Sequence, residues 1–330
     1  MQPNPYFIKA LAFLLLVFTL SSCEPTQPGS WKNDKIDKSD REKFHLLNAE
    51  LFKQLKVDDV KQLENMMSKE FIESTYKNRQ VELVSNRAKT ATYTLLDEYY
   101  VVNRYKDGDT VKTDTKGVNS HTLNFQGATH QMYMAFFTPK NLVNQYMITA
   151  IYCKYDYGWK LSQLDLNPYT INGKTAPELF EQAKESYQKN YLIDALNISA
   201  SVINCARPSS VWKYDNEPEF SDLYNKVLQE ATARFRFPIA IKQVATHPRI
   251  IRIFNQTTPD GVFPMIYYMS AIKLKDTTAL KQENEQIKKV IDQTLPGIDK
   301  NKKYIYYAAF NDLPTGMKTV EHFDMTEKLN

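Results

Sequence analysis

The residues best suited to acid–base chemistry are a histidine and an aspartate in neighbouring strand patterns. His130 lies in a strand pattern over residues 129–138, where it shares one face with the apolar residues Met132 and Phe136. We expect that face to point inward. Asp97 lies in an earlier strand pattern, and a carboxylate opposite an inward histidine suits general acid–base catalysis. A hydrogen-bonded structural histidine is the simpler interpretation.

The sequence contains no other catalytic constellation. His45 and His121 complete no metal-binding spacing, and there is no His-Glu-x-x-His motif, phosphate loop or Gly-x-Ser-x-Gly elbow. Cys153 and Cys205 have no neighbouring His or Asp, so we expect buried free thiols, although the sequence leaves a disulfide open. We therefore expect no cofactor and no metal site, and the lack of motifs favours a protein that is not an enzyme.

Aromatic residues are unusually frequent, with 21 Tyr and 17 Phe. Packing within sheets accounts for most of them. Tyr267, Tyr306 and Tyr307 lie in C-terminal strand patterns whose side chains alternate between two faces, so some of these rings must point away from the local core. These three tyrosines are the candidate binding residues.

The N-terminal residues indicate where the protein is located and how it is attached there. Residues 1–22 are a secretory signal, with a single charge before an apolar run that is too short for a transmembrane helix. The residues Leu20-Ser21-Ser22-Cys23 resemble the bacterial lipobox, in which the chain is cut before the cysteine and the cysteine is acylated. The resemblance implies a Bacteroidota-type lipoprotein that carries palmitate or a similar chain on Cys23. We expect it in the cell envelope, at the outer membrane.

Charge and composition narrow the class of partner. The formal net charge of +4 is small for 330 residues, and no concentrated basic run is present. Nucleic acid is therefore not the expected partner, because phosphate binding needs a basic patch. With 42% apolar residues the chain is expected to fold, and its length requires more than one domain.

The first domain is expected to combine helices with an antiparallel sheet. Residues 23–39 are rich in Pro, Lys and Asp, and predict a flexible tether. A capping box at Ser39-Asp40-Arg41-Glu42 predicts the start of a helical segment, and hairpin-linked strands follow as far as Asn167-Pro168. Helices followed by such strands predict an α+β fold with a curved sheet against the helices.

This order resembles the NTF2-like cone fold over residues 40–168. The resemblance depends on the short second helix that opens on Asp58-Asp59-Val60 and on the last hairpin, which ends in Tyr157-Gly158-Trp159-Lys160-Leu161. The family includes enzymes and non-enzymes, and the resemblance implies that a site would lie in the cone between helices and sheet. His130 and Asp97 would then be its catalytic candidates.

Two further regions complete the chain. Residues 169–238 are helical, open on the capping box Thr175-Ala176-Pro177-Glu178, and resemble a single TPR; a plain helical connector is the alternative. Residues 239–330 predict a small α+β domain whose helix is capped by Asp276. Its expected strands cover residues 249–254, 265–274, 303–310 and 319–323, and its expected helix covers 277–295.

These features favour a lipid-anchored envelope protein with a non-catalytic binding or scaffolding role. Its expected contacts are the membrane, through Cys23, and an envelope protein or a glycan. The alternative is a hydrolase or isomerase whose site lies in the NTF2-like cone.

Overall fold

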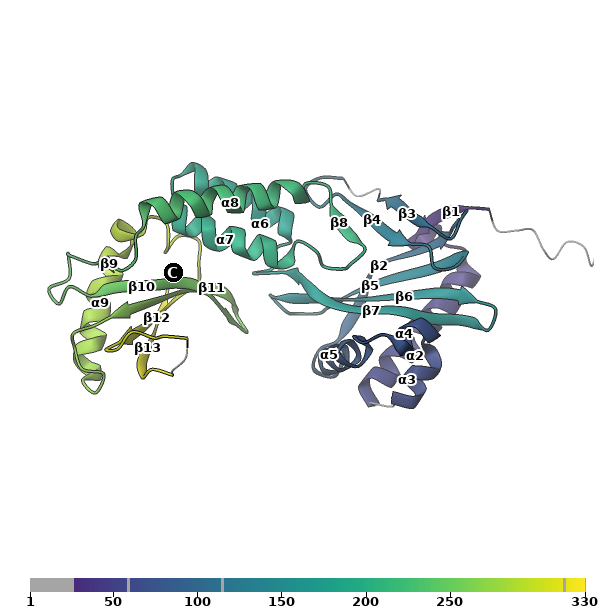
Figure 1. Cartoon of the computed structure of the whole chain (residues 1–330), viewed down its shortest axis with the longest axis horizontal. Coiled ribbons are helices and arrows are strands. Elements are labelled where there is room, and N and C mark those ends of the chain that lie inside the picture. The colour runs from purple at the N-terminus through teal and green to yellow at the C-terminus, as the bar shows by residue number, and fades with distance from the viewer. Residues whose placement is uncertain (1–26, 58–59, 114–115, 317–318, 330) are drawn as a thin grey trace, which may run out of the picture.

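The computed structural model describes residues 27–57, 60–113, 116–316 and 319–329. The predicted signal, the lipidation site at Cys23 and the cap at Asp58-Asp59 lie outside these residues. Figure 1 shows a mixed α/β molecule with a sheet at each end and helices that lie across between them. None of the described helices is both long and apolar enough to cross a membrane.

The first sheet has five antiparallel strands in the order β1-β2-β5-β6-β7. The strands are β1 (Gly29–Lys32), β2 (Tyr93–Val102), β5 (Gln131–Pro139), β6 (Gln145–Tyr155) and β7 (Gly158–Thr170). Both faces of this sheet are apolar, because β5 and β6 carry buried side chains at almost every position rather than at alternate ones. Each face must therefore be covered by other elements.

The first face is covered by four helices. They are α2 (Lys38–Val57), α3 (Val60–Met66), α4 (Lys69–Glu73) and α5 (Lys77–Thr90). The ring of Phe44 on α2 stacks on Tyr133 of β5 with 4.2 Å between centroids, and Leu51 is fully buried in the same cluster. Aromatic stacking thus ties the longest of these helices to the middle of the sheet.

The second face is covered by the helices of the middle region and by a small sheet. The helices are α6 (Ala176–Gln188), α7 (Leu192–Cys205) and α8 (Glu217–Arg234), and the strands are β3 (Gly108–Lys112), β4 (His121–Gln126) and β8 (Trp212–Tyr214). β4 pairs with β3 on one side and with β8 on the other. Residues 169–238 therefore contribute a strand and a core face to the preceding region.

The predicted tether over residues 23–39 is wrong from Gly29 onward. β1 pairs with β2, and the ring of Trp31 stacks on Tyr100 with 5.6 Å between centroids. The polar composition of this stretch did not indicate a strand. The stacking of Trp31 on Tyr100 helps to hold this short strand at the edge of the sheet. The predicted capping box at Ser39 also differs, because α2 begins at Lys38 and the side chain of Asp37 accepts a hydrogen bond from the Ser39 amide.

The C-terminal sheet has the order β13-β12-β11-β10-β9 and packs one face on α9. Its elements are β9 (Ile239–Ala240), β10 (Arg249–Thr258), β11 (Gly261–Met269), α9 (Thr277–Thr294), β12 (Tyr304–Phe310) and β13 (His322–Lys328). β11 and β12 run parallel, with α9 between them in the chain, and the other neighbours are antiparallel. Leu192, Ile193 and Ala231 from α7 and α8 belong to the same hydrophobic cluster, so the helical layer packs on this sheet too.

Two predicted helix caps are confirmed. Thr175 and Glu178 form a reciprocal capping box at the start of α6. The side chain of Asp276 accepts a hydrogen bond from the Ala279 amide at the start of α9. Each cap satisfies amides that have no partner within the helix.

The packing of α2 gives a direct test. Leu51→Ala removes a fully buried side chain, whereas Leu46→Ala on the same helix changes one that is 72% exposed. We expect Leu51→Ala to lower the free energy of unfolding by about 2 to 5 kcal/mol, and Leu46→Ala to change it by about 0.5 kcal/mol at most. Urea denaturation followed by tryptophan fluorescence measures both. Equal effects of the two substitutions would contradict the described packing of α2.

Candidate binding site

The predicted acid–base pair does not come together. Asp97 lies opposite Phe136 in the register of β2 and β5, and six residues separate Phe136 from His130, which is roughly 20 Å along a strand. The Asp97 carboxylate is 2.8 Å from the Lys32 ammonium and accepts a hydrogen bond from Asn33. His130 is exposed and precedes β5.

We predicted that the face of residues 129–138 that carries His130, Met132 and Phe136 would point inward, toward the first helices. This prediction is also wrong. Met132 and Phe136 point toward the small sheet and the α6–α8 layer, whereas Tyr133 and Phe137 point toward α2–α5. Both sets are buried, so the apolar pattern could not identify the face that the first helices cover.

The cysteines and the acidic residues show no reactive arrangement either. Cys153 and Cys205 are free and buried, and burial raises the pKa of both thiols, that of Cys205 to about 12. A thiol with a raised pKa stays protonated near neutral pH and is a poor nucleophile. Among the described residues, no group of three or more His, Cys, Asp or Glu is placed to hold a metal ion.

A buried polar cluster around Glu98 was not predicted. Glu98 is fully buried on β2, its carboxylate lies 2.5 Å from Arg41 Nε and 3.0 Å from His45 Nε2, and Tyr133 donates a hydrogen bond of 2.8 Å to it. The Tyr133 hydroxyl in turn accepts a hydrogen bond from Asn48.

The Glu98 cluster joins α2 to the sheet. Burial, and then the Glu98 charge, raise the pKa of the Tyr133 phenol, and the hydrogen bond to Glu98 raises the pKa of Arg41. Both carboxylate oxygens already have partners, so the arrangement suits fastening a helix better than binding a ligand. No sequence motif marks it, because more than fifty residues separate Glu98 from Arg41 and His45.

The three predicted tyrosines separate onto opposite faces of the C-terminal sheet. Tyr307 is fully buried on the face toward α9, where burial and Glu327 raise the pKa of its phenol and its hydroxyl donates to the Glu327 carboxylate. Tyr307 therefore cannot contact a partner, and its prediction as a binding residue is wrong. Tyr267 and Tyr306 lie on the other face and are partly exposed.

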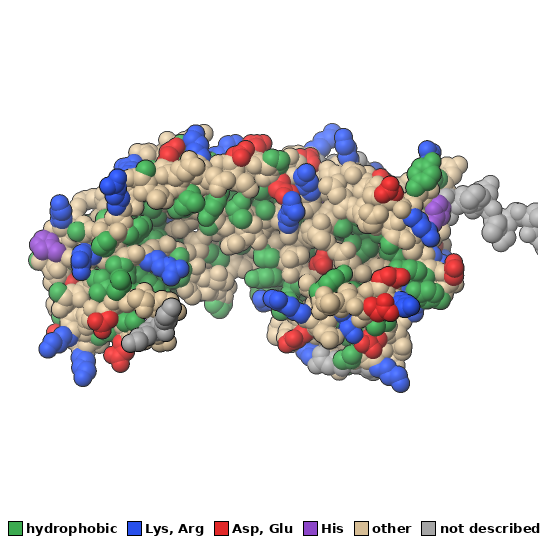
Figure 2. Space-filling view, viewed as in Figure 1, with side chains coloured by type: hydrophobic (Ala, Val, Ile, Leu, Met, Phe, Trp, Pro, Cys, Tyr) green, Lys and Arg blue, Asp and Glu red, His purple; other side chains and the backbone are tan. Residues whose placement is uncertain are grey.

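That other face carries a row of aromatic rings, which we call the aromatic face. Tyr267 lies 5.0 Å from Phe254 and 4.8 Å from Phe310, and Phe263 lies 5.4 Å from Tyr304, all between ring centroids. The aromatic face consists of Phe254, Phe263, Tyr267, Tyr304, Tyr306, Phe310 and His322. These rings belong to none of the three hydrophobic clusters of the described residues. Figure 2 shows hydrophobic side chains gathered at this end of the molecule and a hollow between the two sheets.

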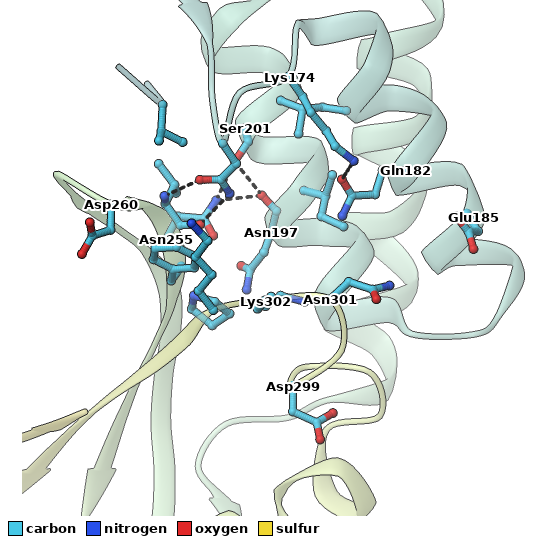
Figure 3. Close-up of a pocket in the computed structure, with 18 residues that line it drawn as sticks. Lys174, Gln182, Glu185, Asn197, Ser201, Asn255, Asp260, Asp299, Asn301 and Lys302 are labelled. Atoms are coloured by element: carbon cyan, nitrogen blue, oxygen red, sulfur yellow. Dashed lines mark hydrogen bonds between the residues drawn. The ribbon is translucent and has the colours of Figure 1, made fainter. Parts of the chain in front are cut away.

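A cavity of about 560 Å³ lies where α6 and α7 meet the C-terminal sheet, and we call it the junction pocket. Its polar lining includes Asn172, Lys174, Gln182, Glu185, Asn197, Ser201, Asn255, Asp260, Asp299, Asn301, Lys302 and Lys303. Figure 3 shows Asn255 hydrogen-bonded to the Asn197 carbonyl and to the Ser201 hydroxyl on one wall. Phe263 lines the pocket and also contacts Tyr304 and Tyr306, so the junction pocket and the aromatic face adjoin at this buried ring.

The sequence could not have revealed the junction pocket. Its lining comes from five separate parts of the chain between Val143 and Lys303, and amide side chains are common on protein surfaces. A concave site with several polar groups beside aromatic rings is suited to reversible binding. Comparison with known proteins adds no relative, because no protein-family model, curated protein or solved structure matches this chain.

Proposed function

We propose that this chain is a lipid-anchored cell-envelope protein that binds a partner without catalysis, through the aromatic face and the junction pocket. The observation that carries the proposal is the aromatic face itself. Its tyrosines, Tyr267, Tyr304 and Tyr306, are partly exposed, and the buried Phe263 beside them adjoins a polar cavity. Aromatic side chains beside a cavity are the usual energetic centres of a binding surface.

The arrangement of titratable groups favours binding over the alternative, a hydrolase or isomerase. His130 and Asp97 lie far apart, Glu98 is fully engaged, and both described cysteines are buried. General acid–base catalysis needs its groups within hydrogen-bond reach of one substrate. None of these groups meets that condition.

The geometry of an anchor at Cys23 also suits this role. Gly29 begins β1 only six residues after Cys23, and six residues span at most about 20 Å. The first sheet would therefore lie close to the bilayer. Figure 1 places β1 and the C-terminal sheet at opposite ends of the molecule, so the aromatic face would be held away from the membrane.

The two fold resemblances belong to the same proposal. Four helices on one face of an antiparallel sheet support an NTF2-like assignment for residues 40–168. The consecutive helices α6 and α7, which pack on one another, support a single TPR-like pair within residues 169–238. In this proposal the NTF2-like unit is not the binding site, whereas α6 and α7 supply one wall of the junction pocket and hold the C-terminal sheet in position.

Acylation at Cys23 has a direct test. We expect the wild-type chain to incorporate a palmitate analogue and to fractionate with membranes, and Cys23→Ser to do neither, because the serine cannot be acylated as the lipobox cysteine is. Click labelling and detergent partitioning measure the two properties. A wild-type chain that is unlabelled and fully released into the aqueous phase would contradict the proposed anchor.

Partner binding is tested by removing two rings of the aromatic face. We expect the double variant Tyr267→Ala, Tyr306→Ala to capture roughly tenfold less of a specific partner from detergent-solubilised envelope, since each ring is expected to contribute contact area. Tyr105→Ala is the matched control, because Tyr105 is 74% exposed and lies outside this face. A loss of capture in His130→Ala, with the double variant unaffected, would place the site in the first domain and overturn the proposal.

A further inference from the structure

We infer that the junction pocket binds an uncharged sugar. The inference rests on the proposed function, because the junction pocket and the aromatic face share Phe263. A volume of about 560 Å³ lies within the usual range for small-ligand sites. The ligand class follows from the charge of the lining, from its amide content and from one unpaired amide.

The lining offers little net charge. Three lysines and three carboxylates line the pocket, so their formal charges cancel. Half of these groups are already paired with residues outside the lining: Lys302 with Asp194, Glu185 with Lys189, and Asp299 with Lys300. A phosphate, a polyanionic chain or a basic peptide would find no opposite net charge in this lining.

The remaining polar groups are mostly amides. Five of them line the pocket: Asn172, Gln182, Asn197, Asn255 and Asn301. The Asn172 amide is bonded to Val262 and the Asn255 nitrogen to α7, so Gln182, Asn197 and Asn301 are the amides that a ligand would meet. An amide side chain offers two donors and an acceptor in one plane, which matches the adjacent hydroxyl groups of a sugar, each of them both donor and acceptor. A lining rich in amides therefore suits a polyhydroxyl ligand better than an apolar one.

Asn197 gives the most specific indication of what the ligand must offer. Its side-chain nitrogen is buried and has no hydrogen-bond partner among the described residues. An unpaired buried donor costs about 1 to 3 kcal/mol, and a small rotation of the side chain toward a ligand hydroxyl that accepts from it would recover that cost. In Figure 3 the Asn197 side chain extends from α7 toward the loop that carries Asn301 and Lys302.

The apolar part of the lining includes Val143, Val262 and the buried ring of Phe263. One face of a pyranose carries C–H groups, which pack on apolar side chains while the hydroxyl groups at the ring edge reach polar side chains. Phe263 is held by Tyr304 and Tyr306 on the aromatic face and lines the same cavity as Asn197 and Asn255. One ligand could therefore contact the amide wall and these apolar side chains together.

The test is calorimetric titration of the purified full chain in detergent with four uncharged probes: maltohexaose, cellohexaose, mannohexaose and chitohexaose. A heparin hexasaccharide serves as the charged probe. We expect at least one uncharged probe to bind, and Asn197→Leu and Phe263→Ala each to weaken its binding tenfold or more. Asn225→Ala, an exposed amide on α8, should leave the affinity unchanged. Asn197→Asp keeps the side-chain size, should weaken binding as well, and provides a second test if Asn197→Leu does not fold.

Three results would overturn the inference. They are no binding of any uncharged probe, tighter binding of the heparin probe, or binding that is insensitive to both Asn197 variants. The proposed function would survive these results if the double variant of Tyr267 and Tyr306 still lost its partner, because that partner would then be a protein. It would fail separately if a sugar bound at Asn197 while the tyrosine variants captured the partner normally.

Discussion

At the junction between the helical layer and the C-terminal sheet, the side chain of Asn172 makes a paired contact with the backbone of β11. The Asn172 side chain donates a hydrogen bond of 2.8 Å to the Val262 carbonyl and accepts one of 2.6 Å from the Val262 amide. It therefore pairs with the backbone at the start of β11 as a residue of a neighbouring strand would. The contact requires Gly261, which has a φ of +143° and whose added Cβ would lie 2.5 Å from Asn172 Oδ1. Because Asn255 is also bonded to Asn197 and Ser201 on α7, two polar contacts fix the walls of the junction pocket. The candidate site thus exists only because the two parts of the chain are held in one relative position.

The first sheet explains why the middle helices pack closely on their neighbours. Both of its faces are apolar, and α6 to α8 together with β8 cover the face that α2 to α5 leave open. The same helical layer supplies Leu192 and Ile193 to the core of the C-terminal sheet. One layer therefore completes two cores, which couples the stability of the two ends of the molecule.

Local signals in the sequence were sufficient for several elements and insufficient for the site. The caps at Thr175 and Asp276 and the helix after Asp276 follow from neighbouring residues, and the structure confirms them. The strand β1, the return of β8 to pair with β4, and the ion pair of Glu98 with Arg41 each join residues far apart in the chain. Alternation along β12 predicted that adjacent tyrosines would face opposite ways, but it could not say that Tyr307 is the buried one. A helix on one side of the sheet decides that, and its placement is a property of the whole fold.

In the proposed function the aromatic face is the surface that binds a partner. The most direct measurement places a photo-crosslinking benzoylphenylalanine at Tyr306 or at Tyr105 in the intact envelope and compares the adducts formed on irradiation. Tyr306 lies on the aromatic face, and Tyr105 is exposed elsewhere. We expect a discrete adduct from position 306 and none from position 105. Adducts of equal yield at both positions, or an adduct from position 105 alone, would contradict it.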